Sequence, residues 1–188
     1  MSEEAMIRNC APTLAGIKTG NLFRYPYCSA DEMRSSVRDW NRKLRGKGIR
    51  ILPLSYQKEH ALIYVYRPSH LSDDLQNKEA DRILHNCGYR TGSSEQCVVQ
   101  LIRRIRECGD FPHEIGLFLG YPPEDVSGFI EQKACGYKCV GCWKVYGDEQ
   151  KCRKLFQQYK HCTHSYEEQY RRGVHVTVLA VNEKKKAP

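Results

Sequence analysis

The chain has 188 residues and a formal net charge of +8, and 40% of its residues are hydrophobic, which places it among globular proteins of ordinary domain size. No run approaches the roughly 18 apolar residues of a membrane helix, and the acidic start at residues 1–6 does not match a secretory signal. We therefore expect a cytoplasmic protein without a membrane partner, in which a reducing environment keeps the ten cysteines out of disulfides.

The first expected elements are a helix and a β-hairpin. Ser29 and Glu32 form a capping box that starts the helix, and Gly46 ends it. Its apolar residues recur at helical spacing and predict one buried stripe: Met33, Val37, Trp40 and Leu44. Residues 49–54 and 61–66 are predicted to be two strands joined by a short polar turn.

Helices are expected in the middle of the chain. Residues 69–88 and 93–109 each begin at a serine, carry a spaced apolar stripe and end at a glycine. The apolar segment at residues 111–122 is consistent with either a buried strand or a short helix. Pro123 then starts another helix, because proline suits the first helical position and acids follow it in the first turn.

The last part of the chain predicts a strand at residues 143–146, a long helix and a final strand at residues 174–181. Strands that alternate with helices indicate an α/β or α+β protein. We expect a mixed sheet with a hairpin at about residues 49–66 and helices packed on it. The predicted organisation is a single domain at residues 1–181 and a basic tail without fixed structure at residues 182–188.

Four cysteines fall on apolar faces of the expected helices: Cys87, Cys97, Cys108 and Cys152. A thiol in such a position is usually a small core residue. We therefore interpret these four as part of the hydrophobic core.

Cys135, Cys139 and Cys142 form the densest group of cysteines, with the spacing C-x3-C-x2-C. The same spacing holds the iron–sulfur cluster of radical S-adenosylmethionine enzymes, although Gly141 stands where those enzymes usually carry an aromatic residue. Zinc is the second interpretation, since Cys139 and Cys142 form one knuckle that supplies two of the four ligands. The candidates for the remaining ligands are Cys135, Cys152, His161, Cys162 and His164. The pattern is also consistent with a redox C-x-x-C pair, or with partly buried thiols that carry no chemistry.

Residues 34–50 carry one acid, Asp39, and seven basic side chains: Arg34, Arg38, Arg42, Lys43, Arg45, Lys47 and Arg50. Basic residues that are mixed with an aromatic residue such as Trp40 also occur in nucleic-acid sites. Trp40 lies on the apolar stripe of the expected helix, however, so the basic residues are better explained as its solvated face. Nucleic-acid or anion binding is an alternative that the pattern does not favour.

His113 and Glu114 form a polar pair directly before an apolar run. A histidine at the end of an element can serve as a general base or as a metal ligand. The alternative is a histidine that binds backbone groups. The sequence contains none of the phosphate-binding, serine-hydrolase or zinc-protease motifs that would indicate a particular activity.

Three segments resemble one family of uncharacterised proteins. They read CAPTLAGIKTGNLF at residues 10–23, FPHEIGLFLGYP at residues 111–122, followed by Asp125 and Val126, and GCWKVY at residues 141–146. Over nearly its whole length the chain resembles the domain-of-unknown-function family 3793, which is common in clostridia and other anaerobic Firmicutes. The resemblance implies a bacterial cytosolic origin and one intact domain, and it implies no reaction, cofactor or fold. It directs attention to five residues of the motif segments: Cys10, Lys18, His113, Glu114 and Asp125.

The first hypothesis about function is an enzyme with a thiol site. In this hypothesis Cys10 is the nucleophile or redox-active thiol, and His113 is the base that takes its proton. Glu114 or Asp125 would orient His113, and Lys18 is the remaining candidate site residue. Both Cys10 and His113 lie in polar-flanked motif segments and not on apolar stripes, which is the observation that motivates the pairing.

Two binding functions compete with this hypothesis. One is a zinc or iron–sulfur protein with redox or metal-binding activity, in which the three clustered cysteines at residues 135–142 are the ligands. The second is a nucleic-acid or anion-binding module that uses the basic face of residues 34–50. The sequence does not decide whether the protein is an enzyme.

Overall fold

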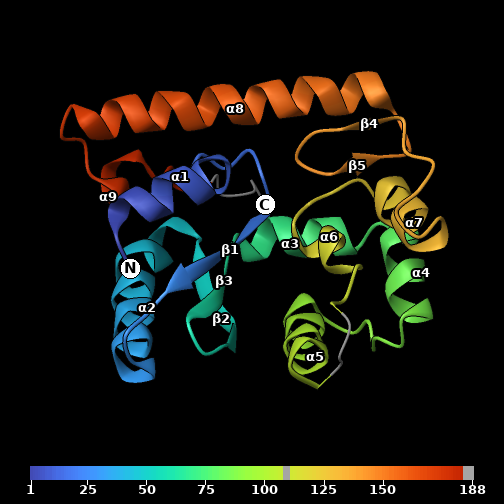
Figure 1. The fold of residues 1–188 in the computed structure, drawn as a ribbon, viewed down its shortest axis with the longest axis horizontal. Helices are drawn as coiled ribbons and strands as arrows, with labels where there is room; N and C mark the ends of the chain where they lie inside the picture. The colour runs from blue at the N-terminus through green and yellow to red at the C-terminus, as the bar shows by residue number, and fades with distance from the viewer. Residues whose placement is uncertain (108–110, 184–188) are drawn as a thin grey trace, which may run out of the picture. The chain divides into compact units, whose positions relative to one another are not determined.

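The computed structural model describes residues 1–107 and 111–183 (Figure 1). The chain forms two compact units, one made of Met1–Ser69 with His161–Pro188 and the other of His70–Lys160. They are described separately below as the first and the second unit. The expectation of a single domain at residues 1–181 stays a prediction. Residues 184–188 of the predicted tail lie outside the described residues, as does Cys108.

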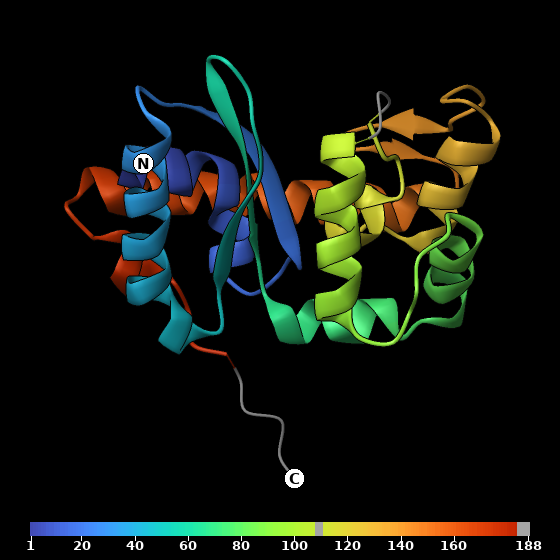
Figure 2. The same ribbon diagram turned by 90° about the horizontal axis from the view of Figure 1, so that it is seen from below.

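The first unit combines helices with a three-stranded sheet. Its elements are α1 (Glu3–Leu14), β1 (Gly20–Pro26), α2 (Ala30–Leu44), the 3-10 helix η1 (Arg45–Lys47), β2 (Arg50–Tyr56), β3 (His60–Tyr66) and α9 (Val176–Leu179). Strand β3 lies between β1 and β2, and both pairings are antiparallel (Figure 2). The predicted hairpin and the α+β alternative are confirmed. The sheet is antiparallel and not mixed, because β1 pairs with the second strand of the hairpin.

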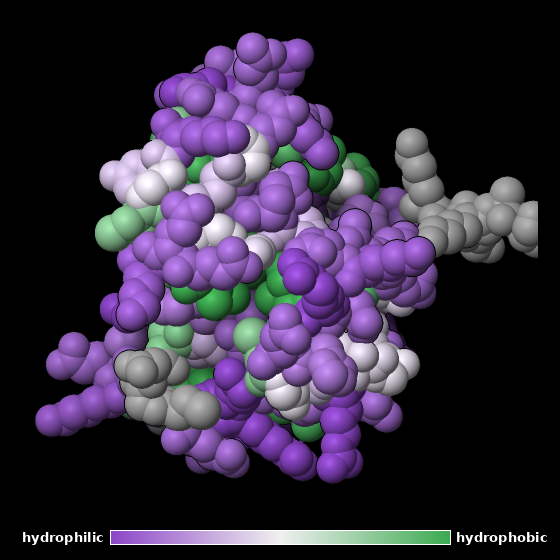
Figure 3. Space-filling view, turned by 90° about the vertical axis from the view of Figure 1, so that its right-hand side faces the viewer, coloured by the Kyte–Doolittle hydropathy of each residue, from purple (hydrophilic) through white to green (hydrophobic). Residues whose placement is uncertain are grey.

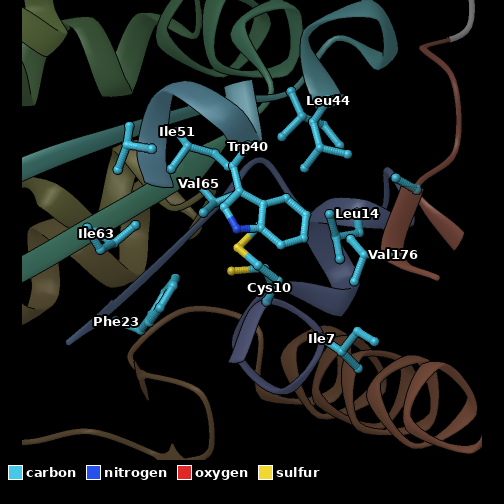
Figure 4. Close-up of a cluster of buried hydrophobic side chains, with 14 of the residues drawn as sticks. Ile7, Cys10, Leu14, Phe23, Trp40, Leu44, Ile51, Ile63, Val65 and Val176 are labelled. Atoms are coloured by element: carbon cyan, nitrogen blue, oxygen red, sulfur yellow. The ribbon is translucent and has the colours of Figure 1, made fainter. Parts of the chain in front are cut away.

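The core of the first unit lies on one face of this sheet. In β3 the alternate residues Ala61, Ile63 and Val65 point to that face, and the register places Phe23 of β1 opposite Ile63. Helices α1, α2 and α9 cover the face with buried apolar side chains: Met6, Ile7, Leu14, Met33, Val37, Trp40, Leu44, Val176 and Leu179 (Figure 4). Successive residues of a strand point to opposite faces of a sheet, so a period-two pattern of apolar residues buries one face in the core.

Helix α2 forms as its sequence predicts. The Ser29 side chain accepts a hydrogen bond from the Glu32 backbone N–H at 3.2 Å, which satisfies one of the free donors at the start of the helix. The predicted apolar stripe is buried along its whole length. The end differs from the prediction, because a 3-10 turn extends the helix and Gly48, with φ +73°, takes the left-handed position that was expected at Gly46.

The two ends of the first unit differ most from the sequence expectation. Helix α1, which contains Pro12, and strand β1 were not predicted. The predicted final strand at residues 174–181 is wrong, because the short helix α9 forms there. The Glu3 carboxylate accepts a hydrogen bond from the Val176 backbone N–H at 3.2 Å, and this tertiary contact supports the start of α9.

The second unit is mainly helical and contains a small hairpin. Its elements are α3 (Pro68–Leu75), α4 (Lys78–Asn86), α5 (Ser94–Glu107), α6 (Ile115–Phe118), α7 (Pro123–Glu131), β4 (Cys139–Val140), β5 (Lys144–Val145) and α8 (Glu149–Arg171), of which α3 and α8 continue from or into the first unit. The helix predicted at residues 69–88 is two helices, because Asn77 stops α3 and caps α4 by accepting from the Glu79 backbone N–H at 2.9 Å. The ambiguous segment at residues 111–122 contains the short helix α6.

None of the described helices combines the length and the apolar character that crossing a bilayer requires. The face of the molecule in Figure 3 is mostly hydrophilic and is interrupted by small hydrophobic patches. Single exposed apolar residues are common on proteins of this kind.

Arg67 is a buried charge at the end of the sheet in the first unit, and its side chain is 1% exposed. Its Nε and Nη2 atoms donate to the carbonyl oxygens of Thr13 and Leu14, both at 2.8 Å. Nη1 donates to the carbonyl of Lys47 at 3.0 Å, and Nη2 also donates to that of Val181 at 2.9 Å. One guanidinium therefore binds the end of α1, the turn after α2 and the segment after α9 through backbone groups.

Replacing Arg67 with methionine is expected to destabilise the first unit by at least about 3 kcal/mol, because several buried carbonyl groups lose their donor at once. The matched control is Arg24→Met, which removes an exposed arginine from β1 and is expected to change stability by less than about 0.5 kcal/mol. Urea unfolding followed by tryptophan fluorescence and circular dichroism measures both. Equal urea midpoints of unfolding for the two variants would show that the Arg67 guanidinium contributes little to stability.

Candidate functional site

Asp125, in the first turn of α7, is a buried carboxylate whose side chain is surrounded by donors. It is 2% exposed. Its Oδ1 accepts from the backbone N–H groups of Tyr146 and Gly147, both at 2.7 Å. Its Oδ2 accepts from the Trp143 indole N–H at 2.7 Å and from the Cys152 thiol at 3.3 Å. These bonds connect α7 to the end of β5 and to the first turn of α8.

The four hydrogen bonds explain why a charge can be buried at this place. An unpaired carboxylate in an apolar interior is strongly disfavoured, and hydrogen bonds to its charged form offset that cost. A carboxylate offers about four acceptor positions, and all of those of Asp125 are in use. Asp125 therefore acts as a support for the surrounding loop, without a spare lone pair for a proton from a substrate.

Cys152 shows the electrostatic effect of this arrangement. Burial raises the pKa of its thiol, and the hydrogen bond to Asp125 and the charge of that carboxylate raise it further, to about 12. The thiol form is favoured because only the neutral group can donate to Asp125. Cys152 is thus a structural donor and is protected from thiolate chemistry at neutral pH.

Aromatic rings fix the loop that carries Trp143. The indole stacks on Tyr121 with ring centroids 4.4 Å apart, and Phe156 meets it edge-on at 4.6 Å. Gly141 lies so close to Phe156 that a Cβ atom there would stand 2.1 Å from the ring. Any larger residue at position 141 would have to displace the hairpin or the Phe156 ring, so the packing favours glycine here.

A pocket of about 360 Å³ opens beside this loop, and we call it the motif pocket. Its aromatic lining residues are Phe111, Tyr121, Phe129 and Trp143. Its polar lining residues are His113, Asp125, Cys142 and Lys144. The motif segments FPHEIGLFLGYP and GCWKVY, together with α7, supply almost all of this lining, although about twenty residues separate them in the chain.

His113 and Lys144 are the basic side chains of the motif pocket. The exposed imidazole of His113 meets Phe129 edge-on at 4.9 Å, and within residues 1–107 and 111–183 neither of its nitrogens makes a hydrogen bond. The Lys144 ammonium group donates to the carbonyl of Ala134 at 2.8 Å and lies 4.7 Å from the centre of the Tyr137 ring. The contact with Ala134 uses one of its three donors, so the ammonium group retains further hydrogen-bonding capacity.

Glu114 is not one of the residues that line the motif pocket. It is 3% exposed and accepts from the Tyr89 hydroxyl at 3.0 Å and from the Arg104 Nε at 2.8 Å. Burial and the charge of Glu114 raise the pKa of Tyr89. In the described part of the chain neither Glu114 nor Asp125 forms a hydrogen bond with His113, so the predicted orienting role has no contact to support it.

Cys10 and Lys18, the other two predicted site residues, belong to the first unit. Cys10 is completely buried and belongs to the cluster of apolar core residues that also contains Trp40 (Figure 4). Burial raises the pKa of Cys10, and the charge of Lys18 offsets this only in part. Lys18 is also buried and donates to the carbonyl of Gly20. This environment favours the neutral thiol, whereas the predicted nucleophile requires the thiolate.

The three clustered cysteines are in different environments. Cys139 is buried, whereas Cys135 and Cys142 are exposed. Within residues 1–107 and 111–183, no three histidine, cysteine or acidic side chains are grouped so that they could hold a metal ion. The structure therefore does not bring the predicted zinc or iron–sulfur ligands together as one set.

Of the cysteines that were interpreted as core residues, Cys97 and Cys152 are buried. Cys87 is half-buried at the end of α4. The prediction is therefore confirmed for the first two residues.

The basic face of α2 is solvent-exposed, as predicted, but much of its charge is paired locally. Arg34 lies 2.6 Å from the Asp31 carboxylate, and Arg42 lies 3.3 Å from that of Asp39. Lys43 lies over the Trp40 ring at 5.2 Å. These contacts fit a solvated helix face, and nucleic-acid or anion binding there stays a prediction.

A family described as "Protein of unknown function (DUF3793)" matches residues 6–180. The chain belongs to this family. The matched region contains every residue named above in the motif pocket, and the family description gives them no role. No curated protein and no solved structure matches the chain.

Reasoning from the sequence missed Tyr121, Phe129, Trp143 and Lys144 as site residues. All but Phe129 lie in the family motif segments. The useful signal was that each of the two motif segments contains both aromatic and polar residues. That they line one pocket depends on the Asp125 hydrogen bonds, which the sequence pattern does not reveal.

Removing the Asp125 carboxylate with Asp125→Ala is expected to destabilise the second unit by about 3 kcal/mol or more, since a buried indole N–H and two backbone N–H groups lose their acceptor. Glu124→Ala is the matched control, because Glu124 is exposed in the same helical turn and its loss is expected to cost less than about 1 kcal/mol. Urea unfolding followed by fluorescence, to which Trp143 contributes, measures the difference. Similar losses in both variants would contradict the role of Asp125 as the support.

The raised pKa of Cys152 predicts a loss of stability at alkaline pH. In the unfolded chain the thiol ionises near pH 8.5, whereas in the folded protein its pKa is about 12. The stabilisation is complete below the unfolded pKa and is lost as pH rises between these values, by roughly 2 kcal/mol at pH 10. Urea unfolding from pH 7 to pH 10 is expected to show a flatter pH dependence for Cys152→Ser, which donates to Asp125 but does not titrate. Equal slopes for the variant and the natural protein would refute the assignment.

Proposed function

We propose that the second unit binds a small organic anion with an aromatic ring in the motif pocket. The observation that carries the proposal is an open pocket with aromatic walls and basic side chains, His113 and Lys144, in its lining. Its volume of about 360 Å³ lies at the lower end of the range typical of small-molecule sites. A ligand with one or two rings is therefore the appropriate size.

The aromatic walls support a planar apolar group in the ligand. Phe111 and Phe129 line the pocket together with Trp143, whose ring is held in place by its neighbours. Phe111 is 47% exposed, so a bound ring would cover apolar surface that is now in contact with water. Offset or edge-on contact between rings adds to this burial.

The polar groups support an anionic substituent. Lys144 has donors beyond the one that binds Ala134, and His113 makes no hydrogen bond within the described residues. Asp125, the acid in the lining, already accepts four hydrogen bonds, which counter its charge. A carboxylate or similar group on the ligand would then meet donors at the pocket and little repulsion.

Preorganisation further supports a binding function. The loop at residues 141–147 is held by hydrogen bonds to Asp125 and by packing on Phe156, so its lining residues are in position before a ligand arrives. A rigid site avoids the entropic cost of ordering loops and side chains on binding. The hypothesis of a thiol enzyme with Cys10 as its nucleophile receives less support, because Cys10 is fully buried.

Isothermal titration calorimetry with indole-3-acetate and its neutral analogue indole-3-acetamide tests the proposal. The anion is expected to bind more tightly than the amide. Lys144→Gln is expected to weaken binding of the anion by about tenfold, because it removes a charge-assisted contact. The same variant should change binding of the amide by less than about twofold.

Two further variants distinguish binding in the motif pocket from general effects of a substitution. Phe129→Leu is expected to weaken both compounds, because it removes an aromatic wall without removing charge. Lys154→Gln removes an exposed lysine that does not line the pocket and is expected to have no effect. Absence of binding of both compounds to the natural protein, or equal weakening by the two lysine variants, would overturn the proposal.

A further inference from the structure

Cys142 occupies the tip of the β4–β5 hairpin, at the edge of the motif pocket. Val140 and Lys144 are paired across the hairpin, and the Gly141 N–H donates to the Trp143 carbonyl at 3.0 Å to close the turn. The Cys142 side chain is exposed and lines the pocket. A thiol at this place is accessible to a small molecule that enters the pocket.

Both neighbours of Cys142 in the chain are fixed. Gly141 packs directly against the Phe156 ring, and the Trp143 indole N–H donates to Asp125 at 2.7 Å. The backbone of Cys142 is therefore held between two anchored residues, while its side chain contributes to the pocket lining. A fixed nucleophile beside a binding site reacts as if the bound partner were present at high concentration.

The residues that share the pocket with Cys142 suit thiol chemistry. His113 lines the same pocket, and an imidazole is a side chain that can act as a general base. The Lys144 ammonium group, two residues along the chain, provides positive charge for an anionic partner. Cys142 is thus part of a group with a base and a cation, in contrast to Cys10 and Cys152, which are buried.

We infer that Cys142 exchanges its thiol with small disulfides in which one half carries an aromatic ring and a negative charge. His113 takes the proton of the Cys142 thiol, and the thiolate attacks one sulfur of the bound disulfide. A new bond forms between that sulfur and Cys142 Sγ, the original S–S bond breaks, and the other half leaves as a thiolate. Atoms and electrons balance without another oxidant, since the disulfide itself is reduced to one free thiol. The inference rests on the proposed function, because the pocket must accept the aromatic anion.

The test is the reaction of the natural protein with 5,5′-dithiobis(2-nitrobenzoate), in which each half is an aromatic ring with a carboxylate. Bis(2-hydroxyethyl) disulfide serves as the neutral, non-aromatic reagent. Mass spectrometry of peptides measures the initial rate at each cysteine. Cys28 is the internal control, because it is exposed, belongs to the first unit and does not line the pocket.

The expected result is that Cys142 reacts at least about tenfold faster than Cys28 with the aromatic reagent, and within about threefold of Cys28 with the neutral one. Saturating indole-3-acetate should slow the reaction at Cys142 and leave Cys28 unchanged. His113→Gln should slow Cys142 and move its rate profile to higher pH, because the base is lost. The inference would be overturned if the ratio of the Cys142 rate to the Cys28 rate is near one with both reagents, or if Cys28 is modified preferentially.

The two proposals can fail separately. If Cys142→Ser still binds indole-3-acetate but the natural protein shows no preference for Cys142, the thiol inference is wrong and the binding function stands. If the natural protein does not bind indole-3-acetate and Cys142 also shows no preference, both are wrong. If Cys142 reacts selectively with the aromatic reagent but the natural protein does not bind indole-3-acetate, the proposed function is overturned, and the thiol inference, which rests on it, is overturned as well.

Discussion

The site in the second unit depends on the hydrogen bonds that one buried carboxylate, that of Asp125, accepts. An ionised carboxylate in this position would destabilise the fold if it lacked hydrogen-bond donors, because a buried charge without such donors is strongly disfavoured. The loop after β5 must therefore bring its Tyr146 and Gly147 backbone N–H groups to Asp125, and Trp143 and Cys152 must turn their side chains inward. These requirements fix the hairpin tip and, with it, the side chains of Cys142 and Lys144 in the motif pocket.

The first unit uses the opposite charge in a comparable way. The Arg67 guanidinium is buried, and four backbone carbonyl groups from three separate segments surround it. In both units, then, an ionised side chain is bound largely by backbone groups or neutral donors and not by an opposite charge. Such an arrangement is specific, since hydrogen bonds to a fixed charge require defined distances and directions, whereas apolar packing tolerates more variation.

The two units differ in what their motif residues do. In the first unit the motif segment at residues 10–23 supplies core and buried polar residues, including Cys10 and Lys18. In the second unit the motif segments supply buried supports, such as Asp125, and also exposed groups that line a pocket, such as His113 and Cys142. A family motif can therefore contain residues that serve stability and residues that suit chemistry, and burial separates the two. For this reason we assign the proposed thiol reaction to Cys142, which is accessible, and not to Cys10, which is buried.

The sequence by itself determined the elements whose signals are local: the capped helix α2 with its buried stripe, the hairpin of β2 and β3, the helices α5, α7 and α8, and the membership in the family. It did not determine α9, where valine-rich residues indicated a strand, because the Glu3 carboxylate near the start of the chain supports a helix start there. It suggested His113 and Asp125 as members of one thiol site and Cys142 separately, as a metal ligand. Only the tertiary structure placed these three residues around one pocket, because the hydrogen bonds and ring contacts that join α7 to the loop at residues 141–147 leave no periodic pattern in the chain.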